Sequence, residues 1–194
     1  LSSVKKLSSL NSLAYIRTSL RMTNAGLTDN QADVALKTDI ARATYGVDGS
    51  GIKIGVLSDS YNTLGEADIA ISAGDLPGPG NPDGYLTPVT VLKEYSGVGT
   101  DEGRGMLELI HDIAPAAELY FYTAFEGEAD FANGILALAE AGCQVIVDDV
   151  SYLAEPFFQD GIIAQAVDQV HSQGVSYFSS AGNYGDNSYQ AAFR

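Results

Sequence analysis

Two acidic residues, Asp59 and Glu102, stand where a carboxylate could take part in proton transfer. Asp59 closely follows residues 52–57, a short and almost wholly apolar run that predicts a strand buried on both faces of a sheet. In parallel α/β sheets, ligands and catalytic groups gather at the carboxyl ends of the strands. An aspartate at a strand end can also do no more than cap a turn, so its chemistry depends on the groups that lie beside it.

Glu102 lies near the start of a helix predicted over residues 100–112. Met106 and Leu109 follow it at helical spacing, which predicts that Glu102 lies on the apolar stripe facing the core and His111 on the outer face. Acidic residues in a first helical turn are also stabilised by the helix dipole. Burying a carboxylate costs free energy unless a partner compensates its charge. A catalytic role for Glu102 would explain why a carboxylate lies on the buried side of this helix.

Two further predicted strands end in polar or small residues. The strand over residues 144–149 ends in two aspartates and is followed by Ser151 and Tyr152. The strand over residues 175–179 runs into the segment Ala-Gly-Asn, which closes with Asn183. If both strands are parallel to the first, all these groups lie at one edge of the sheet.

From residue 52 onward, predicted strands alternate with predicted helices, and these elements position the residues named above. Alternating strands and helices of this length predict right-handed βαβ units and an α/β fold, a three-layer doubly wound parallel sheet. The predicted strands cover residues 52–57, 88–92, 119–124, 144–149 and 175–179, and the predicted helices cover residues 100–112, 129–141 and 162–172. Residues 63–86, rich in Gly, Pro and Asp, are expected to lie outside the core.

The first 45 residues differ from the rest of the chain. They hold most of its basic residues and contain a predicted helix over residues 31–45, after which the glycine-rich residues 46–51 break the chain. We therefore expect two parts, an N-terminal lead over residues 1–45 and a domain over residues 46–194.

The acidic composition argues against nucleic acid and anionic membranes as partners. The formal charge of −15 leaves no basic patch for nucleic acid or anionic membranes, and it suits a soluble protein that is secreted or extracellular. No apolar run is long enough to span a membrane. The single cysteine, Cys143, lies in an apolar run and is expected to be a buried small side chain rather than a reactive thiol.

Three of these segments together resemble the subtilisin-like serine peptidases in order and spacing. Residues 52–60 resemble the strand that carries the catalytic aspartate of that family, and residues 175–183 resemble its strand ending in Ala-Gly-Asn. Glu102 and Gly103 fall where the family has His-Gly, and the glutamate is similar to that of the sedolisin relatives of subtilisin. The resemblance covers residues 46–185 and implies a subtilisin-like fold that is incomplete at its C-terminus.

The resemblance implies a serine endopeptidase whose catalytic residues are Asp59, Glu102 and Asn183. Asn183 would donate a hydrogen bond to the tetrahedral oxyanion. A carboxylate base next to a second carboxylate would favour activity at acidic pH. A peptide or protein substrate would bind as an extended strand. The residues that would line it on its two sides are Ser151, Tyr152, Ala181 and Gly182.

One part of the implied site is absent from the sequence. No Gly-Thr-Ser segment carrying a nucleophile follows Asn183, so the 194-residue chain alone is expected to be inactive. Apolar surface left open by the missing part would be covered by a partner chain, a second copy or a further C-terminal segment. The resemblance also implies that residues 1–45 are the tail of a pro-segment.

Other functions stay open. A relative that kept the fold and lost the chemistry would be a non-catalytic binding or structural module. A nucleotide- or sugar-binding α/β domain is weakened by the lack of a phosphate loop. No cofactor is indicated with certainty, although aspartates among residues 66–86 could bind calcium.

Overall fold

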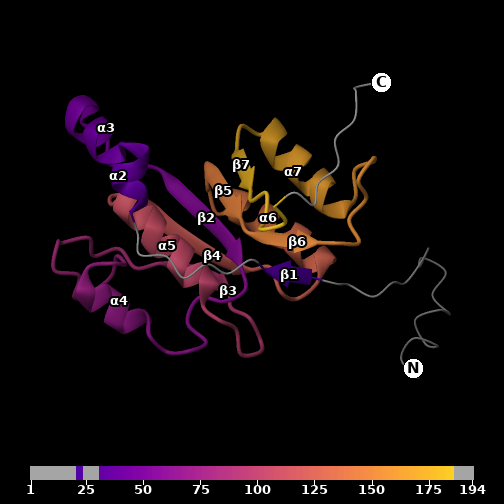
Figure 1. The fold of residues 1–194 in the computed structure, drawn as a ribbon, viewed down its shortest axis with the longest axis horizontal. Helices are drawn as coiled ribbons and strands as arrows, with labels where there is room; N and C mark the ends of the chain where they lie inside the picture. Colours follow the sequence, from indigo (N-terminus) through magenta and orange to yellow (C-terminus); the bar gives the residue numbers. More distant parts are fainter. Residues whose placement is uncertain (1–20, 24–30, 186–194) are drawn as a thin grey trace.

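The centre of the molecule is a sheet of five parallel strands (Figure 1), in a computed structural model that describes residues 21–23 and 31–185. The strand order is β3-β4-β2-β5-β7. The strands are β2 (Lys53–Ser58), β3 (Thr90–Lys93), β4 (Glu118–Thr123), β5 (Val145–Asp148) and β7 (Ser176–Ser179). Two short strands outside this sheet, β1 (Arg21–Thr23) and β6 (Val150–Tyr152), pair antiparallel. The predicted parallel α/β sheet is confirmed, and β2 is buried along its length except at Lys53.

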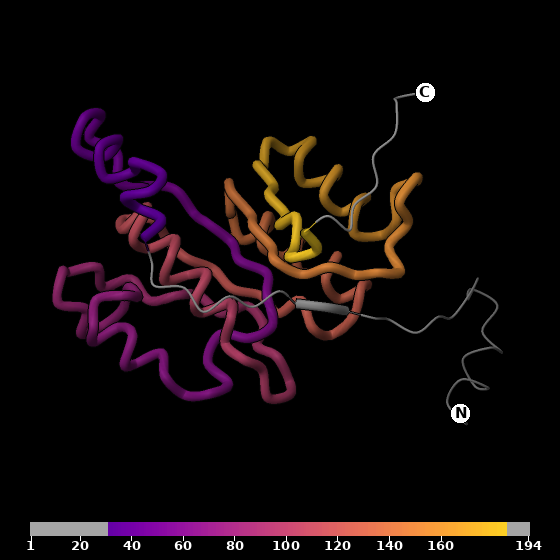
Figure 2. The backbone as a smooth tube through the Cα atoms, in the orientation of Figure 1, coloured from indigo at the N-terminus to yellow at the C-terminus, as the bar shows by residue number. Residues whose placement is uncertain are grey.

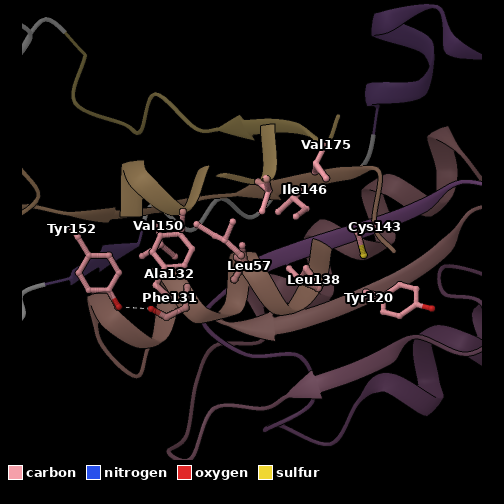
Figure 3. Close-up of a cluster of buried hydrophobic side chains, with 14 residues drawn as sticks. Leu57, Tyr120, Phe131, Ala132, Leu138, Cys143, Ile146, Val150, Tyr152 and Val175 are labelled. Atoms are coloured by element: carbon pink, nitrogen blue, oxygen red, sulfur yellow. Dashed lines mark hydrogen bonds between the residues drawn. The ribbon is translucent and has the colours of Figure 1, made fainter. Parts of the chain in front are cut away.

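Helices cover both faces of the sheet. They are α2 (Ala32–Leu36), α3 (Thr38–Tyr45), α4 (Ala67–Ala73), α5 (Glu102–Ile113), α6 (Glu128–Glu140) and α7 (Ile162–Ser172). On one face Leu107 of α5 belongs to a buried cluster with Val56 and Phe121. On the other face α6 and α7 contribute to a second cluster that contains Leu57 and Ile146 (Figure 3). Alternate residues of β2 therefore anchor the two helical layers.

The connection through α5 differs in hand from those through α6 and α7. The chain moves in the same direction across the sheet from β3 to β4, from β4 to β5 and from β5 to β7. Since α5 lies on the opposite face from α6 and α7, the β3–α5–β4 crossover has the opposite hand. Right-handed crossovers are the rule for parallel strands, so the prediction of right-handed units throughout is wrong for α5. The apolar side chains of β2 point to both faces, and α5 covers the face that α6 and α7 leave open.

Two helical segments depart from the sequence-based expectation. The helix predicted over residues 31–45 is broken at Lys37, whose left-handed backbone (φ 61°) ends α2 and precedes α3. Helix α4 lies within residues 63–86, and it buries Ala67 and Ala70 in the cluster beneath α5. This segment was expected to lie outside the core, because its glycines and prolines masked a short helix.

The buried stripe of α5 lies one position further along the chain than predicted. Gly103, Leu107 and His111 are its buried residues. Gly103 determines this rotation, because a Cβ atom there would lie 2.4 Å from Cε2 of Phe121. His111, predicted on the outer face, is 3% exposed and packs edge-on against Tyr85, with ring centroids 5.1 Å apart.

The smoothed backbone shows where the described ends of the domain lie (Figure 2). Helices α2 and α3 form one extremity, and the carboxyl ends of the strands face away from them. No helix among residues 31–185 combines the length and apolarity needed to cross a bilayer. Cys143 is 1% exposed, and burial raises the pKa of its thiol to about 12, which confirms the expected inert, buried side chain.

Candidate functional site

Three acidic residues meet at the carboxyl edge of the sheet. Asp59 follows β2, Asp149 follows β5, and Glu102 opens α5, whose first turn lies at the same edge. The Glu102 and Asp149 carboxyl groups lie within hydrogen-bonding reach of each other, and both are close enough to Asp59 to be influenced by its charge. Asp59 and Glu102 were predicted as site residues, whereas Asp149 was not.

Asp59 uses its carboxylate to anchor the start of α5. It is 1% exposed, and one oxygen accepts hydrogen bonds from the backbone N–H groups of Ser60 and Glu102, the latter at 3.0 Å. The other oxygen accepts from the backbone N–H and the hydroxyl of Thr100, the latter at 2.7 Å. With both oxygens engaged by two donors each, the carboxylate of Asp59 is held against the first turn of α5.

Glu102 and Asp149 are held differently. Burial raises the pKa of Asp149 to about 7, and the negative charges of Glu102 and Asp59 add to the rise. Burial also raises the pKa of Glu102, the hydrogen bond with Asp149 opposes that rise, and the charge of Asp59 adds to it. Oε2 of Glu102 and Oδ1 of Asp149 are buried and accept no hydrogen bond from any donor in the described structure. A single proton held by Asp149 and donated to Glu102 satisfies this pair.

Glycines allow the start of α5 to approach the end of β2. A Cβ atom at Gly99 would lie 2.1 Å from Oγ of Ser60 and 2.9 Å from Oδ2 of Asp59. Gly103 lies close to the backbone of the same segment, since a Cβ atom there would be 2.7 Å from the carbonyl oxygen of Ser60. Larger side chains at these two positions would separate Glu102 from the strand ends.

Asp148 has a separate environment. Its carboxylate accepts hydrogen bonds from the Tyr177 hydroxyl at 2.6 Å, the Ser179 hydroxyl at 3.0 Å and the backbone N–H of Val150 at 3.3 Å. Burial raises its pKa to about 6, although all three hydrogen bonds oppose the rise. Asp148 therefore binds β7 to β5, and only the second of the two consecutive aspartates joins the candidate site.

The predicted peptide-binding residues of β6 are only partly available. The hydroxyl of Tyr152 donates to the carbonyl oxygen of Ala124, and its ring packs against Phe131 with centroids 5.6 Å apart (Figure 3). The side chain of Tyr152 is thus part of the core. Its backbone and that of Ser151 pair with β1 in an antiparallel register that places Arg21 opposite Tyr152 (Figure 1).

The residues after β7 lie at the same edge of the sheet. Ala181 and Asn183 are exposed, and Gly182 is half-buried. Asn183 is thus accessible, as a donor to a substrate must be. Its predicted role at the oxyanion, like the substrate contacts of Ala181 and Gly182, stays a prediction.

The serine hydroxyls nearest these acids are not free nucleophiles. Ser58 is fully buried, Ser60 donates to Asp101 at 2.8 Å, and Ser179 donates to Asp148. In the described ranges no three Asp, Glu, His or Cys side chains are grouped to hold a metal ion, and the possible calcium site among residues 66–86 stays a prediction. The side chain of Asn81 makes hydrogen bonds to backbone groups of the loop over residues 74–85. It donates to the carbonyl oxygen of Leu76 and accepts from the N–H of Asp83.

Comparison with known proteins gives a likeness of fold. No family model matches the chain, and no curated protein matches it. Among solved structures it is similar to the crystal structure of a lanthipeptide protease, with a TM-score of 0.52 and 20% sequence identity. The alignment covers 78% of this chain and 45% of that one, so the chain spans less than half the length of that protease.

These findings overturn the assignment to the subtilisin-like and sedolisin-like peptidases. Neither a family model nor a curated relative supports it, and a structure at 20% identity carries the fold alone. The three short motifs misled because general features of a parallel sheet produce them. An apolar strand followed by an aspartate is one such feature, and Asp59 illustrates it by anchoring the next helix.

Proposed function

We propose that this chain provides the acid–base part of a peptidase site, with Glu102 and Asp149 as a pair of carboxyl groups that share one proton. The observation that carries the proposal is the meeting of the buried Asp149 and the half-buried Glu102 at the carboxyl edge of a parallel sheet, with the charge of Asp59 beside them. Strongly perturbed carboxyl groups brought together from different elements are typical of catalytic sites. The likeness of fold to a protease supports the choice of reaction.

The proposed chemistry is serine-type hydrolysis of a peptide bond. Ionised Glu102 takes the proton of a serine hydroxyl as the serine oxygen attacks the carbonyl carbon of the substrate. The proton then passes to the nitrogen of the leaving amine, and water cleaves the resulting ester with the same residue as base. Asn183 would donate to the oxyanion. Ser58, Ser60 and Ser179 are buried or engaged, and the proposed nucleophile is a serine other than these three.

The proposed substrate is an extended peptide that pairs with β6. Support comes from β1, which shows that the backbone of residues 150–152 accepts an antiparallel strand. Ala181 and Gly182 would lie on the other side of the peptide. We also propose that residues 1–45 are distinct from the domain over residues 46–194, with β1 lying on the peptide-binding strand. A secreted or extracellular location, and the absence of nucleic acid and membrane partners, stay predictions.

Peptide hydrolysis by the full-length product of the gene tests this proposal. The substitutions Glu102→Gln and Asp149→Asn keep the size of each side chain and remove the shared proton, and loss of a general base costs about 10²–10⁴-fold in kcat. Glu140→Gln, at an exposed position at the end of α6, is the matched control. Hydrolysis by the unmodified protein should fall above about pH 7, where Asp149 loses its proton. It should also fall at low pH, where Glu102 becomes protonated. Equal kcat in all four proteins would refute the role of the pair.

A second candidate function is peptide binding without hydrolysis. The pairing of β1 with β6 favours it, because strand addition requires no nucleophile. Peptides that bind, compete with β1 for β6 and are recovered intact at every pH would establish this function in place of the first.

A further inference from the structure

Asp101, the residue before Glu102, is buried and strained. Its side chain is 0% exposed, and its backbone is left-handed with φ 56°. This conformation is unfavourable for most residues other than glycine. Such strain persists only where the surroundings over-determine it, and it concentrates at functional sites.

The surroundings of Asp101 over-determine it with five hydrogen bonds to its carboxylate. One oxygen accepts from the hydroxyl of Ser60 and from both the hydroxyl and the N–H of Thr63, each at 2.8 Å. The other accepts from the N–H of Leu64 at 3.1 Å and from Nη1 of Arg104 at 2.8 Å. Burial alone would raise the pKa of Asp101, but hydrogen bonds from Thr63, Ser60 and Leu64 outweigh it and leave the pKa lowered. Asp101 is therefore held as an ionised carboxylate that joins the segment after β2 to α5.

The backbone on either side of Asp101 is fixed by the same segment. The N–H of Asp101 donates to Oγ of Ser60 at 2.8 Å, and the N–H of Glu102 donates to Asp59 at 3.0 Å. The peptide that carries Glu102 is thus held from two directions at the end of β2. Arg104 extends the attachment, since it also pairs with Glu66 at 3.2 Å and Glu108 at 3.4 Å.

We infer that Asp101 is a positioning residue that keeps the Glu102 carboxyl group against Asp149 by fixing the first turn of α5. The inference rests on the proposed acid–base pair and adds the residue that maintains it. Asp101 acts through Glu102 and needs no contact with substrate.

Carboxyl titration by ¹³C NMR, recorded on the protein without substrate, tests the inference. In the unmodified protein the Asp149 carboxyl should titrate near pH 7. Asp101→Asn should lower that midpoint by about one pH unit, because Glu102 and its charge move away from Asp149. Lys37→Gly is the control for relief of left-handed strain at a distance from the site, since Lys37 has φ 61°. It should leave the midpoint unchanged.

If Asp101→Asn does not fold, two milder variants test the same inference. Thr63→Val removes one of the five hydrogen bonds, whereas Thr63→Ser retains the hydroxyl. The first should lower the Asp149 midpoint in the same direction, and the second should restore it.

The outcomes separate this inference from the function on which it rests. If Glu102→Gln lowers the Asp149 midpoint but neither Asp101→Asn nor Thr63→Val does, the pair exists and Asp101 does not position it. If Glu102→Gln also has no effect, the carboxyl pair itself is wrong, and both proposals are overturned.

Discussion

Replacing Asp149 with asparagine is expected to change how the stability of the protein depends on pH. Asp149 is 9% exposed, and the folded pKa of its carboxyl group, about 7, lies well above the ordinary value of 3.8. Between these values the folded protein binds more protons at this position than the unfolded chain does. Stability from this group is therefore fully present below about pH 4 and is lost as the pH rises through 7.

The size of the loss follows from the shift. A rise from 3.8 to about 7 corresponds to about 4 kcal/mol, at ~1.4 kcal/mol for each pKa unit. Asparagine does not titrate, so Asp149→Asn should lack this dependence. Relative to the unmodified protein, the variant should gain about 4 kcal/mol of unfolding free energy between pH 4 and pH 8.

Urea unfolding followed by circular dichroism at several pH values between 4 and 8 measures this difference. Titrating groups that do not interact with Asp149 occur in both proteins and cancel in the comparison. Glu102 and Asp148 do not cancel fully, because Asp149 influences the pKa of each of them. In the Glu102→Gln variant the loss of stability with rising pH should occur at a lower pH than in the unmodified protein. The charge of Glu102 is the second cause of the raised pKa of Asp149, and the variant lacks that charge. Two stability curves that stay parallel across this range would show that Asp149 does not hold a proton in the folded protein, and the argument would fail.

Two further predictions concern the supports of the site. Gly103→Ala should destabilise the protein by about 1–3 kcal/mol, because its Cβ would meet Phe121, whereas Gly105→Ala, with open space around it, should be neutral or slightly stabilising. Equal unfolding free energies for the two variants would contradict the close packing of α5 on the sheet. Tyr177→Phe should raise the pKa of Asp148 above about 6, since the lost hydrogen bond favours the ionised form. A carboxyl resonance that titrates at the same pH in the variant would disprove this assignment.

The elements of the domain were predictable because their signals are local. Residues 162–172 were predicted as a helix and are one, and the strand predicted over 52–57 differs from β2 by one residue at each end. Apolar runs and helical spacing report burial along a single element. The same local signals placed Asp59 and Glu102 at the edge of the sheet.

What escaped prediction depends on contacts between distant segments. The rotation of α5 is determined by the contact between Gly103 and Phe121, and the hand of the β3–α5–β4 crossover is determined by which face the other helices cover. Neither leaves a periodic mark in the sequence. Asp149 escaped for the same reason, because the sequence could not show which of two consecutive aspartates turns toward Glu102.

The three carboxyl groups of the site differ in burial and in the donors that surround them. Asp59 is buried and accepts four hydrogen bonds, whereas Asp149 is buried with one oxygen that no donor reaches. Glu102 is only half-buried, so its charge is penalised less by burial than that of Asp149. Because burial penalises a charge that hydrogen bonds do not compensate, the shared proton goes to Asp149 rather than to Glu102. An acid, a base and a stabilising charge can therefore arise from three carboxylates of similar intrinsic pKa, through the unequal burial and hydrogen bonding at the ends of β2 and β5 and the start of α5.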